Sequence, residues 1–255
     1  MKRSSGLLVG AVFGVFGIMA QPASAAEIKV LTTGAFKQVV MALVPEYEKA
    51  TGNKVGVDNG TVGQLQKRVD DGESFDVLVL SPKGIEDYIK SGKIAVGTNA
   101  RVGKVGVGVM VKEGAPKPDV STVDAFKKAL LDAKTVGYID PASGGSSGIY
   151  VADLLVKLGI ADQVKPKAKL QKGGHVSDLV KAGEAEIGIH QISEIAGQPG
   201  VTLIGPLPAE IQNYTVYAVG VSAHAKEAEA AKAFIKVLTG PSAAGVLKSK
   251  GMEGA

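Results

Sequence analysis

Three short loops combine glycine with hydroxyl or histidine side chains, and each stands between a predicted strand and a predicted helix. Residues 140–150 read D-P-A-S-G-G-S-S-G-I-Y, residues 58–63 read D-N-G-T-V-G, and residues 172–177 read K-G-G-H-V-S. Glycine lets the backbone approach a ligand, hydroxyls add donors, and the first N–H groups of a helix have no intrahelical partner. These loops therefore predict an anion site at helix N-termini. The alternative for residues 140–150 is a flexible connector whose serine caps the following helix.

Acid–base side chains lie beside these loops. His175 could donate to an anion or act as a base, and the alternative is a surface histidine. His190 ends a predicted strand, where it is either a ligand group or a buried, hydrogen-bonded side chain. Asp140 and Glu194 could accept protons in an isomerase, although such residues are more often helix caps or hinge partners. The three histidines of the chain have no metal-ligand spacing, so we predict neither a metal site nor a cofactor.

Apolar runs alternate with turn residues along the chain, and this pattern predicts the strands and helices that position the loops. Strands are predicted at residues 27–31, 54–57, 75–80, 102–111, 135–139, 168–170, 185–190, 201–204 and 214–221. Helices are predicted at residues 36–51, 64–71, 82–89, 123–133, 147–158, 177–183, 225–238 and 241–250, with a linker around Pro166. This alternation is typical of a doubly wound α/β sheet, in which ligands bind at the carboxyl ends of the strands.

Two of the predicted strands are long, at residues 102–111 and 214–221. If both cross between lobes, the chain folds as two α/β lobes joined by two crossings. Lobe one then takes residues 26–104 and 219–255, and lobe two takes residues 105–218. The small-residue loops of both lobes would line one cleft.

The composition narrows the function classes. The 255 residues are 45% hydrophobic and 21% charged, as in an ordinary soluble globular protein. Low aromatic content, no tryptophan and no basic block argue against a nucleic-acid partner, even with a formal net charge of +4. The chain has no cysteine, which excludes disulfides and thiolate catalysis.

The N-terminus has the pattern of a secretory signal. Lys2 and Arg3 precede an apolar stretch over residues 6–20, and the small residues that follow end in an A-x-A pattern. The apolar stretch is short for a membrane span. We expect residues 1–25 to be a cleaved signal peptide and the mature protein to be periplasmic; the alternative is an uncleaved anchor.

The order of these motifs resembles the periplasmic molybdate-binding protein family. The strand–turn–helix at residues 28–40, the element at 60–72 with the D-V-L-V that follows it, and residues 140–150 carry the resemblance, and residues 238–244 (L-T-G-P-S-A-A) are similar to that family's closing motif. The resemblance implies an α/β, two-lobe type II periplasmic-binding-protein fold, with doubly wound mixed sheets joined by two hinge crossings. It also implies a monomer that binds a small anionic solute and docks on an inner-membrane ABC permease.

The resemblance further implies which residues face the solute, although the loops depart from the family's pattern. The family holds tetrahedral oxyanions by hydroxyls and backbone N–H groups without a counter-charge. Its first-loop serine falls on Ala35, and its second-loop serines fall on residues 61–63. A backbone donor falls near Val176, and the family's tyrosine falls on Gln191. We therefore expect the ligand-binding residues to be Thr33, Gly34, Ala35, Thr61, Ser143, Ser146, Ser147, His175, Val176 and Gln191.

Fewer hydroxyl donors in lobe one favour a larger or carboxylate-bearing anion over strict molybdate specificity. We expect a solute-binding protein of an ABC importer whose ligand is a molybdate-type oxyanion or a small carboxylate. The alternative is catalysis, because one relative with this fold, periplasmic aconitate isomerase, is an enzyme. Resemblance to it would imply that the chain catalyses the cis–trans isomerisation of a small polycarboxylate. Binding is favoured because the loops are rich in hydroxyls and glycine and poor in obvious acid–base groups.

Overall fold

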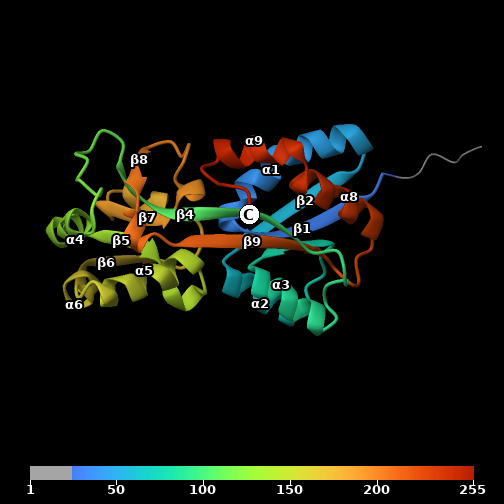
Figure 1. The fold of residues 1–255 in the computed structure, drawn as a ribbon, viewed down its shortest axis with the longest axis horizontal. Coiled ribbons are helices and arrows are strands. Elements are labelled where there is room, and N and C mark those ends of the chain that lie inside the picture. Colours follow the sequence, from blue (N-terminus) through green and yellow to red (C-terminus); the bar gives the residue numbers. More distant parts are fainter. Residues whose placement is uncertain (1–24) are drawn as a thin grey trace, which may run out of the picture.

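Two neighbouring strands, β4 (Ala100–Lys112) and β9 (Tyr214–Val221), run from one lobe to the other in the computed structural model, which describes residues 25–255 (Figure 1). The first half of β4 pairs with β9 in antiparallel register. From Val107 onward β4 pairs instead with β7 (Ile187–Gln191) and β8 (Val201–Pro206). Both predicted crossings are therefore present, and they lie side by side.

All nine strands of the described chain form one sheet in the order β2-β1-β3-β9-β4-β7-β5-β6, with β8 paired to β4. Pairings of β1 with β2 and β3, and of β5 with β6 and β7, are parallel. Every pairing of β4 or β9 is antiparallel, so the sheet is mixed in both lobes, as predicted. The other strands are β1 (Glu27–Thr33), β2 (Lys54–Gly60), β3 (Val77–Leu80), β5 (Val136–Ile139), β6 (Ala168–Gln171), β7 (Ile187–Gln191) and β8 (Val201–Pro206).

The helices of lobe one follow the predicted periodicity. In the first of them, Phe36, Val40, Leu43 and Tyr47 recur at helical spacing and are buried. That helix ends where Gly52 adopts a left-handed conformation (φ 74°), which a glycine takes without steric cost. The helices of this lobe are α1 (Gly34–Thr51), α2 (Val62–Asp70), α3 (Pro82–Lys90), α8 (Ala228–Thr239) and α9 (Pro241–Ser249).

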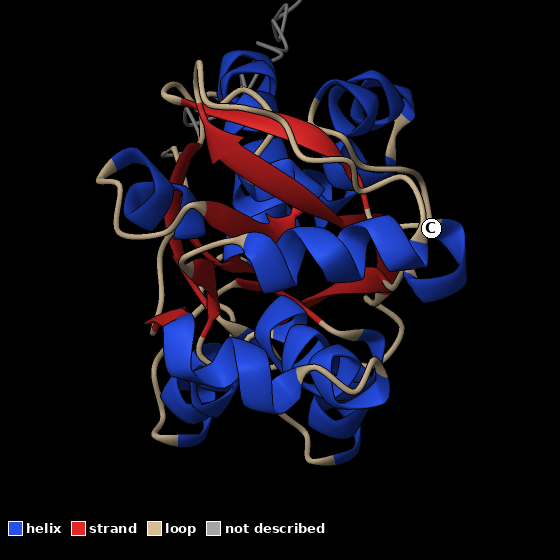
Figure 2. Ribbon diagram, turned by 90° about the vertical axis from the view of Figure 1, so that its left-hand side faces the viewer, coloured by secondary structure: helices blue, strands red, loops and turns tan. Residues whose placement is uncertain are grey.

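Lobe two has one helix that the periodicity did not predict. The short helix α6 (Ala161–Val164) and the 3₁₀ turn Lys165–Lys167 occupy the segment expected to be a linker around Pro166. Four residues are too few to show a helical repeat in the sequence. Helices lie on both sides of the strands (Figure 2). The helices of this lobe are α4 (Val123–Asp132), α5 (Ser146–Lys157), α6 (Ala161–Val164) and α7 (Val176–Lys181).

Each lobe has its own hydrophobic core. In lobe one α1 and α8 pack through Tyr47 and Phe234, whose rings meet edge to face with centroids 5.1 Å apart. In lobe two Phe126 and Leu154 pack over the second half of β4. Val105 belongs to the first core and Val107 to the second. The boundaries at residues 104–105 and 218–219 stay a prediction, because a change of core does not fix the pivot.

Residues 1–24 lie outside the described part of the chain, and the predicted signal peptide falls almost entirely on them. Over residues 25–255, none of the helices has the length and apolar character needed to cross a bilayer.

Candidate functional site

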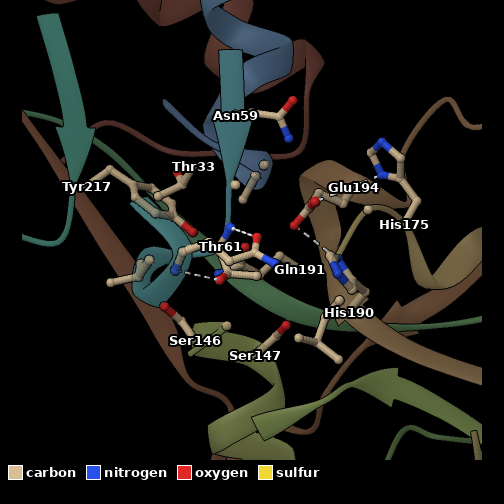
Figure 3. A pocket seen from close by; sticks show the side chains of 18 residues that line it. Thr33, Asn59, Thr61, Ser146, Ser147, His175, His190, Gln191, Glu194 and Tyr217 are labelled. Atoms are coloured by element: carbon tan, nitrogen blue, oxygen red, sulfur yellow. Dashed lines mark hydrogen bonds and ion pairs between the residues drawn. The ribbon is translucent and has the colours of Figure 1, made fainter. Parts of the chain in front are cut away.

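A pocket of about 100 Å³ lies between the lobes, at the carboxyl ends of β1, β2, β5 and β7. On the same scale a water molecule needs roughly 10–15 Å³, so the pocket has room for a small organic anion. Side chains from both lobes converge on it (Figure 3). It is lined by Thr33, Gly34, Ala35, Asn59, Gly60, Thr61, Val62, Gln64, Ile139, Gly145, Ser146, Ser147, Gly174, His175, His190, Gln191, Glu194 and Tyr217.

The N-terminus of α1 forms one wall of this pocket. Thr33 is the N-cap, but its side chain makes no capping hydrogen bond. Its hydroxyl oxygen is buried and has no hydrogen-bond partner within the described residues. The positive end of an 18-residue helix and an unpartnered hydroxyl thus face the same cavity.

The N-terminus of α5 forms the opposite wall. Its N-cap is Gly145, and no side chain caps this helix. Ser147 therefore is not the cap that the connector interpretation required; it is 3% exposed and directed toward the cavity (Figure 3). A Cβ on Gly148 would lie 2.2 Å from the carbonyl oxygen of Ile139, so glycine is what lets α5 begin this close to β5.

Thr61 joins the two lobes at the rim of the pocket. As N-cap of α2 it forms a capping box with Gln64, and its hydroxyl also donates to the carbonyl oxygen of Ser143 across the rim. Gln64 Nε2 donates to the carbonyl oxygen of Lys172 at 3.1 Å. The backbone N–H of Gly63 donates to the carbonyl oxygen of Gly144 at 3.2 Å. These contacts close the cleft over the pocket.

Glu194 and two histidines form a cluster at one end of the cavity. Glu194 follows β7 in the 3₁₀ turn Ile192–Glu194, and its carboxyl oxygens lie 3.1 Å from His190 Nδ1 and 3.9 Å from His175 Nδ1. Neither approach has hydrogen-bond geometry, and within residues 25–255 both nitrogens of His190 lack a partner. A Cβ on Gly34 would lie 2.7 Å from Glu194 Oε1, so the carboxyl can lie against the start of α1 only because residue 34 has no side chain.

Burial keeps this cluster uncharged near neutral pH. It raises the pKa of Glu194 to about 8 and lowers the pKa of His190 to about 3. Burial also lowers the pKa of His175, which is partly exposed. A carboxylic acid beside two neutral imidazoles avoids placing unpaired charges in a dry site.

The hinge strand β9 brings Tyr217 into the pocket. Burial, together with the nearby Glu194, raises the pKa of its hydroxyl, which stays protonated. Gln191 lies beside it at 4% exposure, and its Nε2 has no partner among the described groups. Donors and acceptors from both lobes therefore surround the cavity.

The structure brings most of the predicted ligand-binding residues to this one pocket; their contact with a ligand stays a prediction. Two predicted residues do not line it. Ser143 offers its carbonyl to Thr61 instead, and Val176 is fully buried against Ile139 and Val180 in a small core of lobe two. The predicted residues that do line the pocket are Thr33, Gly34, Ala35, Thr61, Ser146, Ser147, His175 and Gln191.

Sequence reasoning did not consider Asn59 or Tyr217, and it weighed His190 and Glu194 without including them among the expected ligand-binding residues; all four line the pocket. Asn59 lies within the small-residue loop D-N-G-T-V-G, so the composition of this loop could have indicated that Asn59 lies at the site. Tyr217 had no such signal, because it lies inside a strand and not in one of the small-residue loops. Asp140, weighed with Glu194 as a proton acceptor, caps the 3₁₀ turn Pro141–Ser143 and does not line the pocket.

The charges of the pocket restrict its chemistry. None of the described residues that line it is a lysine or an arginine. Arg68 is held outside it by Glu73 and Asp58. The described chain also contains no group of three or more His, Cys, Asp or Glu side chains arranged to hold a metal ion. An anion here would be held by N–H groups, hydroxyls and neutral acid–base groups.

A family model described as "Bacterial extracellular solute-binding protein" matches residues 28–253. Aconitate isomerase from Pseudomonas sp. is 29% identical over 242 residues, which cover 92% of this chain and 90% of that protein. The molybdate-binding protein ModA of Azotobacter vinelandii is 27% identical over 253 residues, covering 92% and 93%.

Solved structures match the fold as well. The periplasmic molybdate-binding protein of Azotobacter vinelandii superposes with a TM-score of 0.75 at 19% identity, covering 88% of this chain and 98% of that one. The sulfate-binding protein SubI of Mycobacterium tuberculosis superposes with a TM-score of 0.73 at 19% identity, covering 90% and 87%. At these identities the likeness concerns the fold alone.

Proposed function

Because the chain belongs to the bacterial extracellular solute-binding protein family, we propose that it binds a small organic anion carrying several carboxylates in the pocket between its lobes. The observation that carries this proposal is the set of buried polar atoms without partners in the described chain. Thr33 Oγ1, Gln191 Nε2 and both nitrogens of His190 all belong to residues that line the pocket. Leaving a buried polar group unpaired costs about 1–3 kcal/mol, which a polar ligand would recover.

The sign of the ligand's charge follows from the two helix N-termini. Helices α1 and α5 both begin at the pocket without a side-chain cap, so their first N–H groups are available to an anion. Ser146 and Ser147 add hydroxyls at the second of these helix ends. One anionic group can be held at each end.

The acid–base cluster favours carboxylates over a tetrahedral oxyanion. Ala35 places no hydroxyl where the molybdate-binding pattern has a serine, while Glu194 and His175 add groups that exchange hydrogen bonds with a carboxylate. A protonated Glu194 donates to a carboxylate oxygen, whereas an ionised one would repel a dianion. An elongated ligand with a carboxylate at each helix end fits both features.

The transport role is part of the proposal. In the periplasm the protein acts as a monomer, captures its solute and delivers it to an inner-membrane ABC permease. Support for this role comes from the family and from the resemblance to molybdate-binding proteins.

A ligand screen tests the proposal. Citrate, cis-aconitate, trans-aconitate and succinate are compared with molybdate and sulfate by thermal shift and calorimetry. A ligand at 100 times its dissociation constant should stabilise the fold by about 2.7 kcal/mol. Stabilisation by the oxyanions alone would overturn the carboxylate assignment.

A second candidate function is the cis–trans isomerisation of an unsaturated polycarboxylate. Two observations favour it: the acid–base cluster of Glu194, His190 and His175 faces the cavity, and a relative at 29% identity is an aconitate isomerase. Incubation with cis-aconitate, followed by ultraviolet absorbance and proton NMR, separates the two functions. Turnover identifies an enzyme, and saturable binding without turnover identifies a carrier.

A further inference from the structure

Glu194 is set apart from the other carboxyls of the chain by what surrounds it. Its side chain is 8% exposed, lies against the N-terminus of α1 and faces the cavity. Every acidic side chain that forms a salt bridge with a lysine or arginine in the described chain lies outside the pocket lining. Glu194 approaches only histidines, so its proton is not displaced by a permanent cation.

We infer that Glu194 is a catalytic acid–base residue that moves a proton between two carbons of an unsaturated polycarboxylate bound in the pocket, with His190 as its positioning residue. The inference rests on the proposed function, since it needs the same anion in the same pocket. To the second candidate function it adds the chemical step, a proton transfer, and the residues that carry it out.

The proton shift is balanced without any co-reactant. The step starts from the ionised form of Glu194, which is the minor form at neutral pH because the pKa is raised to about 8. This carboxylate takes a proton from the methylene carbon that lies between a carboxylate of the substrate and the double bond. The electron pair of that C–H bond becomes a new double bond to the central carbon, and the old π pair moves to the far carbon. That carbon takes the proton back from Glu194, which returns to its ionised form. The double bond has then moved by one carbon, and its new geometry is free to be cis or trans.

Geometry supports Glu194 in both halves of this step. A residue that takes and returns the same proton must reach the two carbons that flank the central one. The Glu194 carboxyl lies at one end of the cavity, and Oε1 is the oxygen that His190 leaves free (Figure 3). The helix N-termini hold the substrate's carboxylates, where the negative charge of the intermediate gathers. A pKa of about 8 suits a group that must act both as base and as acid near neutral pH.

His190 lies against one oxygen of the Glu194 carboxyl. It is 2% exposed, and its Nδ1 lies 3.1 Å from Glu194 Oε2, so the imidazole restricts that oxygen and leaves Oε1 toward the cavity. Other groups act on the cluster from the elements around it. The titratable and charged groups near Glu194 and its two histidines are Tyr217 of β9, Lys37 of α1, and Asp178 and Lys181 of α7.

The first experiment uses cis-aconitate labelled with ¹³C at its methylene carbon. A proton shift converts the labelled methylene into a vinylic carbon, which ¹³C NMR detects directly. Rotation about the existing double bond would leave the label in a methylene and would overturn the proton-transfer step. Absence of turnover by a wild-type protein that binds cis-aconitate would overturn this inference and leave the proposed function standing. If the wild type binds none of the carboxylates, both fail.

The second experiment compares Glu194→Gln with the wild type. The amide replaces the protonated acid without changing its size, so binding of cis-aconitate should change by less than about tenfold, while the isomerisation rate should fall roughly 10²–10⁴-fold. Glu184→Gln, on an exposed loop after α7, is the matched control and should retain the wild-type rate. A Glu194→Gln variant that binds and still turns over at the wild-type rate would overturn the assignment.

Two further variants keep the test decisive if Glu194→Gln does not fold. Glu194→Asp withdraws the carboxyl by one methylene and should slow turnover while keeping its pH dependence. His190→Asn keeps a polar atom near the position of Nδ1 and should move the midpoint of the pH–rate profile, which loss of packing alone would not do. A pH profile that stays unchanged in His190→Asn would remove the positioning role.

Discussion

The backbone N–H of Gly63 donates to the carbonyl oxygen of Gly144 at 3.2 Å, and this bond ties α2 of lobe one to the loop before α5 of lobe two. The two backbones are so close that a Cβ on Gly144 would lie 2.6 Å from the Cα of Gly63. The rim of the cleft can close only because neither residue has a side chain.

Replacing Gly144 with alanine should therefore weaken ligand binding by at least about tenfold, or about 1.4 kcal/mol. The added methyl group blocks the closed rim, and the residue's φ of 71° adds backbone strain of about 1–2 kcal/mol. Gly159→Ala is the matched control, because Gly159 has a φ of 68° but open space around it. Both variants should melt earlier, but only Gly144→Ala should lose affinity in calorimetry.

Closure should also be visible in solution. A ligand that contacts both lobes shifts an equilibrium between open and closed forms toward the closed one. We expect the radius of gyration from small-angle scattering to decrease when the best ligand of the screen is added. Gly144→Ala should show a smaller decrease, and an unchanged radius in the saturated wild type would contradict the hinge.

Ser147→Ala should reduce affinity much more than stability. The hydroxyl faces the pocket, and a hydrogen bond to a charged ligand contributes roughly 1.5–3 kcal/mol. Because Gly145 is the N-cap of α5, the melting temperature of the free protein should change little. Ser242→Ala is the control, since that hydroxyl binds Glu46 on α1, away from the pocket. Early melting with intact affinity would mean that Ser147 acts only on the helix.

Affinity should fall as the pH rises through the pKa of Glu194, at about 8. Below that pH the protonated acid donates to the ligand, and above it the carboxylate repels the ligand, so the affinity should decline by up to tenfold per pH unit. Calorimetry between pH 6 and 10 measures this decline. In Glu194→Gln the same curve should be nearly flat, and a wild-type slope in the variant would assign the effect to another group.

Stability should depend on pH through the same cluster. The pKa of Glu194 rises from 4.5 to about 8 on folding, so between these values the folded state holds a proton that the unfolded chain releases, and its stability falls as pH rises. The pKa of His190 falls from 6.5 to about 3, which makes stability rise with pH up to 6.5. The two effects oppose each other up to pH 6.5, and only the Glu194 effect continues from there to 8.

Denaturation in urea between pH 6.5 and 8 tests this sign. The wild type should lose up to about 1.4 kcal/mol of unfolding free energy per pH unit. Glu194→Gln should lose less over the same interval, because its amide does not titrate. Equal slopes in the two proteins would mean that Glu194 is ionised in the folded state.

The sequence predicted the parts of the fold that depend on local pattern. Apolar repeats located α1 and the long crossing strands, and small-residue loops located most of the pocket wall. The short helix α6 could not be predicted in this way, because four residues are too few to show a helical repeat of apolar positions. Ser143 and Val176 do not line the pocket, because the carbonyl of Ser143 accepts from Thr61 at the rim and the side chain of Val176 packs in a small core; their contact with a ligand stays a prediction.

The centre of the pocket was harder to predict, because it depends on tertiary pairing. Tyr217 reaches the pocket only because β9 pairs with β3 and β4. Glu194 was recognised as an acid, but its position against His190 depends on the 3₁₀ turn after β7, which a sequence pattern of three residues does not specify.

The place of Tyr217 has a mechanical consequence. This residue lines the pocket and also belongs to one of the two strands that join the lobes. The β4–β9 ladder is continuous through the junction apart from a shift in register between Arg101 and Gly103, so rotation of the lobes must twist this ladder. Twisting the ladder turns the wall of the cavity together with its phenol group. A ligand that contacts this phenol would therefore also contact one of the two strands whose twist changes when the lobes rotate.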